Sequence, residues 1–166
     1  MTIRARLAIA TLTAALVTGC AAGDDAGPRG WVSGAARAHE LADEAVARGD
    51  LNEARRTLRA AVDAPIPEAV EPEDRRVVRQ DLLYRLADVE LRASRAAEAE
   101  SLADEGLGLG RARDLFTANL LVMRGRAREA LSKDREAAGD YFEALEINSE
   151  LLDRALEGGS TGEEGR

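Results

Sequence analysis

Cys20 is the residue whose position in the chain points most directly to chemistry. It is the single cysteine among 166 residues, so an intrachain disulfide is excluded. It directly follows the small residues Thr18 and Gly19 and an uncharged apolar run, residues 7–17. A redox or metal role would require partner ligands, whereas covalent attachment of a group to the thiol requires only this one residue. The position therefore favours a modified cysteine.

Residues 1–19 have the pattern of a secretory signal peptide. Arg4 and Arg6 form a short positive region ahead of the apolar run. As a helix this run of about 11 residues would be roughly 16 Å long, about half of what a membrane span needs. We therefore expect cleavage and removal of the segment. Ordinary signal cleavage near Ala21 or Ala22 is one interpretation.

A second interpretation rests on the stretch Leu16-Val17-Thr18-Gly19-Cys20. It resembles the lipobox of bacterial lipoproteins, in which an aliphatic residue, a small residue and Gly or Ala precede the lipid-bearing cysteine. The resemblance implies that Cys20 becomes the lipidated first residue of the mature protein and anchors it to a membrane in the cell envelope. Ala21, in place of the Asp typical of inner-membrane retention, favours the outer membrane facing the periplasm.

Residues that could carry catalysis are scarce. His39 is the only histidine, which excludes a histidine-rich metal site and a catalytic dyad built on a second histidine. His39 and Asp43 are four residues apart and could share a metal, but two ligands are too few, so a surface hydrogen bond is the better interpretation. The G-x-S-x-G string at 158–162 has no strand before it. We expect no enzyme, no metal and no cofactor.

The charge of the chain limits its partners. The formal net charge is −8, and removal of residues 1–19 takes away two arginines and no acid, which leaves −10 on 147 residues. Such an acidic chain is a poor candidate for binding nucleic acid, whose phosphates require a basic face. Its length suits one domain.

The composition predicts an all-α fold, because helix formers dominate and aromatic residues make up only 3% of the chain. Residues 20–34 are rich in Gly and Asp and predict a flexible tether. Residues 35–157 show helical periodicity, and residues 158–166 predict a disordered tail. Within the helical domain the sequence predicts helices over 35–48, 51–64, 73–93, 96–107, 111–131, 134–148 and 150–157.

Three segments of this domain share one skeleton. In each, a small residue is followed at fixed intervals by a turn residue, an alanine, a further packing residue and a second small residue: Ala42, Gly49, Ala54, Leu58, Ala61; Ala87, Ser94, Ala99, Ala103, Gly106; Gly125, Ser132, Ala137, Tyr141, Ala144. The pattern resembles the tetratricopeptide (TPR) repeat. The matching alanines are 45 and 38 residues apart, against a family period of about 34. An unrelated helical bundle is the alternative.

The TPR resemblance implies a short array of about three antiparallel helical hairpins, a TPR-like solenoid, plus a C-terminal helix. It also implies a membrane-tethered, non-catalytic adaptor or assembly factor that binds an extended peptide or a helix. An alternative is a structural subunit of an envelope, secretion or pilus complex, similar to the TPR-containing pilotins. By resemblance, the partner would contact exposed positions on the first helix of each hairpin, namely His39, Asp43, Tyr84, Asp88, Arg92, Asn119, Arg126 and Glu129. These side chains could equally be ordinary surface positions, or the helix near 150–157 could cover them.

Overall fold

The computed structural model describes residues 27–160 of the chain. This part is helical, without a strand. Its six helices are α1 (Pro28–Ala47), α2 (Leu51–Val62), α3 (Pro72–Arg92), α4 (Ala96–Gly108), α5 (Leu115–Ala130) and α6 (Asp134–Ser160). The expected all-α fold is confirmed. None of these helices combines the length and the apolar character that a membrane span requires.

Three short turns join the helices in pairs, and all three have the same backbone geometry. Gly49, Ser94 and Ser132 each adopt a left-handed conformation, with φ of 78°, 59° and 58°. After each of them, the next N–H donates to a carbonyl five residues back: Asp50 to Ala45, Arg95 to Glu90 and Lys133 to Arg128, at 2.8–2.9 Å. This is the Schellman arrangement of a helix end. The three turn positions of the sequence skeleton are therefore structurally equivalent.

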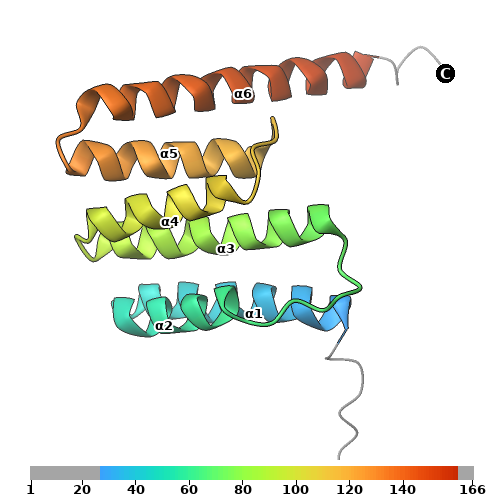
Figure 1. The fold of residues 1–166 in the computed structure, drawn as a ribbon, viewed down its shortest axis with the longest axis vertical. Helices are drawn as coiled ribbons and strands as arrows, with labels where there is room; N and C mark the ends of the chain where they lie inside the picture. The colour runs from blue at the N-terminus through green and yellow to red at the C-terminus, as the bar shows by residue number, and fades with distance from the viewer. Residues whose placement is uncertain (1–26, 161–166) are drawn as a thin grey trace, which may run out of the picture.

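The helices form one continuous stack (Figure 1). Each helix packs against the next along the chain, and α3 also packs against α1 and α5. Small residues permit this close packing, because the alanines that follow the three turns, Ala54, Ala99 and Ala137, are at most 3% exposed. Larger side chains, among them Leu58, Leu86 and Met123, fill the space between the first two pairs of helices and α5.

The first helix begins earlier than the sequence predicts. Pro28 stands at its first position, where its fixed φ suits a helix and its missing N–H costs nothing. Trp31 and Ala35 are buried, so burial favours helix despite Gly30 and Gly34. Residues 28–34 were predicted as part of a flexible tether, and that boundary is corrected to Pro28.

The C-terminal end of the domain also differs from the prediction. Residues 134–160 form one helix, so the separate C-terminal helix expected over 150–157 does not exist. Ile147 is 2% exposed and Leu151 is half-buried, one turn further along the same face. This continuous inner face maintains the helix through Asn148 and Ser149, which are weak helix formers. Gly158, Gly159 and Ser160, predicted as tail, belong to α6.

Candidate interaction groove

Helix α3 places three of the predicted partner-binding residues on one face. Tyr84, Asp88 and Arg92 are spaced four residues apart, so they follow one another along the helix. The ring of Tyr84 is half-buried and packs against both hydrophobic clusters of the domain. Arg92 lies in the last turn of the helix and is 55% exposed. The face therefore passes from an apolar floor to an exposed cation.

A cavity of about 250 Å³ lies beside this face, between α3 and the α1–α2 pair. Asp43 of α1 and the three residues Tyr84, Asp88 and Arg92 line it. Apolar side chains complete the wall: Ala42, Val46, Leu58 and Val89. The structure thus brings four of the eight predicted residues around one cavity.

A second cavity, of about 410 Å³, lies between α3 and α5. Arg126, Glu129 and Ala130 of α5 face Leu91 and Arg92 of α3 across it. Arg92 lines both cavities, so they adjoin at this side chain. We call the two cavities together the α3 groove.

Asp88 links the two helices that border the second cavity. Its carboxylate accepts a hydrogen bond from Arg92 at 2.6 Å and lies 3.5 Å from Arg126. The hydrogen bond from Arg92 to Asp88 raises the pKa of the arginine above its usual value. Both arginine side chains remain more than half exposed, and each guanidinium has five N–H donors, so donors are left for a ligand.

Two residues that the sequence analysis did not single out connect α3 to α1. Arg85 lines the first cavity and lies 3.4 Å from Asp43, which joins α3 to α1. Asp81, one turn earlier on α3, lies 3.4 Å from Nε2 of His39. The sequence could have indicated both residues, because Asp81 and Arg85 are four residues apart. They therefore share a face of α3 that adjoins the face of Tyr84.

His39 lies outside the groove. Its side chain is 17% exposed, and Nε2 has no hydrogen bond although it is buried. Burial lowers the pKa of His39 below its usual value, and the carboxylate of Asp81 opposes this shift. The residue therefore helps to pack α1 against α3.

The α5 positions divide between the groove and other contacts. Glu129 lines the second cavity and accepts a hydrogen bond from the Tyr141 hydroxyl of α6 at 2.9 Å. Burial, together with this hydrogen bond, raises the pKa of Tyr141 to about 12. Asn119 lies two helical turns before Arg126 and lines neither cavity. The α3–α5 cavity is confined to the C-terminal ends of the two helices, so the structure does not bring Asn119 together with the other predicted residues.

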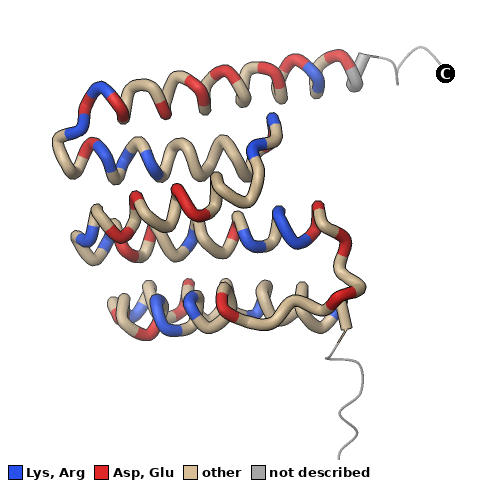
Figure 2. Tube along the Cα trace, viewed as in Figure 1, with Lys and Arg blue, Asp and Glu red and all other residues tan. Residues whose placement is uncertain are grey.

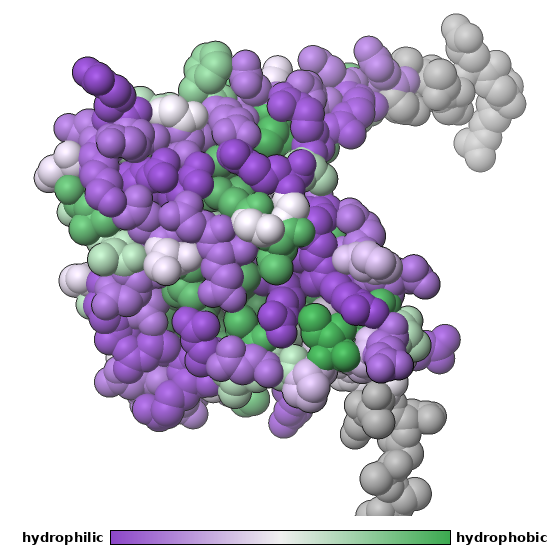
Figure 3. Space-filling model, in the orientation of Figure 1, coloured by the Kyte–Doolittle hydropathy of each residue, from purple (hydrophilic) through white to green (hydrophobic). Residues whose placement is uncertain are grey.

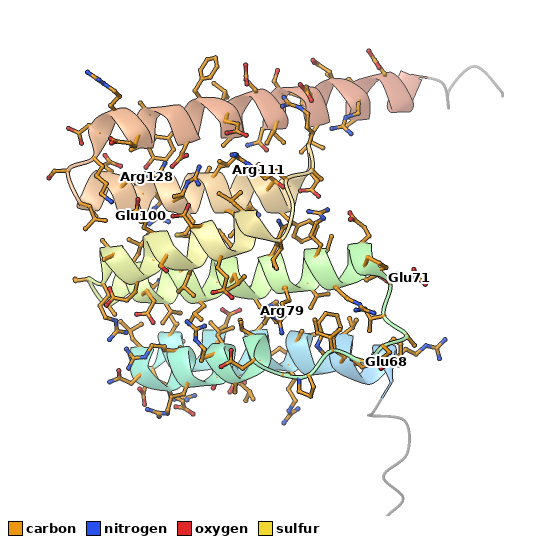
Figure 4. The ribbon with its side chains drawn as sticks, in the orientation of Figure 1. Glu68, Glu71, Arg79, Glu100, Arg111 and Arg128 are labelled. Atoms are coloured by element: carbon orange, nitrogen blue, oxygen red, sulfur yellow. The ribbon has the colours of Figure 1, made fainter. Side chains whose placement is uncertain are left out.

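Helix α6 does not cover the groove. Among the helices it packs against α5 alone. Its ion pairs with α5 lie on the side of that helix away from the groove, where Arg124 and Arg128 both bind the buried carboxylate of Asp140. Figure 4 shows Arg128 beside Glu100 of α4, which it contacts at 3.0 Å. The alternative of a groove covered by a C-terminal helix is therefore wrong.

Within residues 27–160, no three His, Cys, Asp or Glu side chains are placed to hold a metal ion. Cys20, the predicted lipid attachment site, lies outside the described residues. Comparison with protein-family models, with curated proteins and with solved structures finds no match. The groove is therefore interpreted from its own geometry.

Proposed function

We propose that this protein is a membrane-tethered, non-catalytic interaction module that acts as an adaptor or assembly factor in the cell envelope. The observation that carries the proposal is the α3 groove, in which two adjoining cavities combine apolar walls with exposed arginines. In ligand sites, apolar walls supply affinity and a few polar groups fix orientation.

The repeated hairpin geometry supports a TPR-like array. The three turns are equivalent, and the first helices of the pairs, α1, α3 and α5, contact one another in order. Helices α2 and α4, which are second members of their pairs, have no such contact with each other. The groove lies on the first helices, where the resembled family binds its ligands.

An extended peptide or a short helix with acidic and apolar side chains fits this groove. Arg92 and Arg126 offer exposed guanidinium groups that suit carboxylates. Val46 and Leu91 offer apolar surface beside them. Because the cations are exposed, binding should weaken as salt concentration rises.

The tether part of the proposal rests on the resemblance at Cys20. Helix α1 begins at Pro28, so seven residues separate Cys20 from it. Such a segment spans at most about 25 Å when extended. Lipidation of Cys20 would hold the array within that distance of the membrane surface.

Two experiments test the proposal. Cys20→Ser should release the protein from the membrane fraction into the soluble fraction, and a variant that stays membrane-bound contradicts the anchor. For the groove, a photo-crosslinking residue at Ala130 should trap a partner in intact cells, which mass spectrometry then identifies. The same residue at Ala97, exposed on α4 outside the groove, is the control.

Arg92→Ala then shows whether the trapped partner depends on the groove. We expect about tenfold less crosslinked partner, typical of the loss of one central arginine contact. Arg135→Ala, an exposed arginine on α6, should change nothing. Equal crosslinking in both variants contradicts the groove assignment. A stoichiometric partner that resists high salt would instead favour the structural-subunit alternative.

A further inference from the structure

The α1–α2 pair carries an apolar groove that has no occupant among the described residues. Its volume is about 600 Å³, the largest of the three cavities. It is lined by Trp31, Ala38 and Leu41 of α1, by Ala60 and Ala61 of α2, and by the proline-containing segment that follows. Leu41 is 41% exposed here. We call this surface the N-terminal groove.

The N-terminal groove faces away from the rest of the array. Leu41 is two residues from Asp43, which contacts α3, and two residues correspond to about 200° around a helix. Arg37 lines the groove, and the exposed Arg56 precedes Ala60 by one turn on α2. Helix α2 carries three arginines and one glutamate. The groove is therefore apolar at its floor, and Arg37 is the charged residue that lines it.

The opposite end of the array carries an apolar stripe on α6. Phe142, Leu145, Leu152 and Leu156 are 60–66% exposed. With Ala138 and Ser149 they follow the spacing 4, 3, 4, 3, 4, which is the repeat of a helix that packs along a second helix. The face that contacts α5, with Ala144 and Ile147, lies on the other side of α6. We call this surface the α6 stripe.

The α6 stripe has acidic surroundings. Helix α6 contains eight acidic residues and two arginines, a net charge of −6. Glu146 and Asp153, each directly after a stripe leucine, are exposed. Figure 2 shows acidic positions along the length of α6 and basic positions on α2 at the other end of the stack. Figure 3 shows that hydrophilic side chains dominate the outer edge of α6 around the apolar ones.

We propose that the α6 stripe of one copy of this chain docks into the N-terminal groove of a second copy. Arg37 beside the groove has the opposite charge to Glu146 and Asp153 beside the stripe, and the lengths of the two surfaces agree. Leu145 to Leu156 covers about 16 Å of helix, and Trp31 to Leu41 covers about 15 Å. Two α6 helices packed on each other would instead bring like charges together.

The contact joins two different surfaces, so it does not close on itself in a dimer. Each copy keeps one free groove and one free stripe, and further copies can add at both ends. The assembly is an open row of copies. In this row, α6 of one copy packs against the α1–α2 pair of the next copy, as a preceding helix of the same array would. Stacking of this kind buries the end surfaces that a short helical array otherwise exposes.

Photo-crosslinking in cells that make the full chain tests the contact. A crosslinking residue in place of Ala60 should produce a dimer adduct, and mass spectrometry should locate the link in α6. Leu152→Glu should reduce the adduct about tenfold, because a carboxylate would be buried in an apolar contact. Leu109→Glu, at a 42% exposed leucine outside both surfaces, is the matched control.

Complementation separates this contact from a symmetric one. Copies with Leu41→Glu retain the stripe, and copies with Leu152→Glu retain the groove. Neither should form adducts alone, whereas both together, with distinct tags, should form a mixed dimer and nothing larger. If thermal unfolding shows that Leu41→Glu destabilises the fold, Ala60→Glu serves as a second groove variant. Because position 60 is then occupied, the crosslinking residue of that variant replaces Leu156. Adducts that link α6 to α6, or that contain only another protein, overturn the proposal.

Discussion

Tyr141 of α6 packs directly over Gly125 of α5, and no larger residue fits beneath it. A Cβ atom at position 125 would lie 2.6 Å from Cε1 of the ring and 2.9 Å from Cδ1. The hydroxyl of the same ring donates to Glu129 at 2.9 Å, so the ring is fixed at both ends. This close contact between α5 and α6 therefore depends on a glycine in the middle of a helix.

Gly125→Ala should consequently destabilise the protein despite the better helix propensity of alanine. We expect a loss of about 1–3 kcal/mol, the usual range for overpacking, measured by urea denaturation. Gly139→Ala is the control, because nothing lies within 4 Å of its added Cβ, and it should stabilise by about 0.5–1 kcal/mol. Adding Tyr141→Ala should make Gly125→Ala nearly neutral. Equal effects at positions 125 and 139 would contradict the close approach.

At the two serines with left-handed backbone conformation, we expect a substitution to stabilise the protein. Ser94 and Ser132 adopt φ near +60°, where a Cβ atom is unfavourable. Replacing either by glycine should raise the free energy of unfolding by up to about 1 kcal/mol. Ser101→Gly, at an exposed position inside α4, should lower it by a similar amount. A destabilised Ser94→Gly would show that the turn does not require this conformation.

The turns and the helix ends differ in how far the sequence could predict them. The equivalence of Gly49, Ser94 and Ser132 followed from spacing alone, because helix-ending turns have a local signal. The start of α1 and the continuity of α6 could not be read locally. They depend on Trp31 and Leu151 packing against distant residues, which overrides the glycines and the Asn148-Ser149 pair.

The candidate site also has a part that the sequence could predict and a part that it could not. The i, i+4 spacing of Tyr84, Asp88 and Arg92 was enough to place them on one face. The participation of Arg85 and the exclusion of Asn119 depend on how α1 and α5 are set against α3, which no local pattern specifies. The exposure of Leu41 has the same origin, because no other helix of residues 27–160 packs over this side of the α1–α2 pair.

Asp140 is the most deeply buried acid in the ion-pair network of α5 and α6. Its side chain is 5% exposed and binds both Arg124 and Arg128. Asp140→Ala leaves these two partly buried cations without that partner, so we expect a loss of about 3 kcal/mol in urea denaturation. Asp43→Ala is the matched control. Its side chain is 70% exposed in its pair with Arg85, and its loss should cost less than about 1 kcal/mol. Similar costs for the two would mean that the network contributes no more than surface pairs.

His39 makes the stability of the α1–α3 contact depend on pH. Its pKa is lowered from 6.5, first by burial and then by Arg85, while Asp81 and Asp43 oppose the shift. Above the unfolded pKa the imidazole is neutral in both states, and the protein has its full stability. As the pH falls from 6.5 through the folded pKa, the unfolded chain binds the proton more readily, so stability is lost.

His39→Gln should therefore flatten the decline in unfolding free energy between pH 7.5 and pH 5.5, measured by urea denaturation at each pH. Comparing slopes between the two proteins cancels the contribution of the carboxylates common to both. Asp81→Asn should steepen the decline, because it removes the negative charge 3.4 Å from Nε2 that offsets burial. If wild type and His39→Gln show equal slopes, the imidazole is not shielded from water, and its role in packing α1 against α3 is refuted.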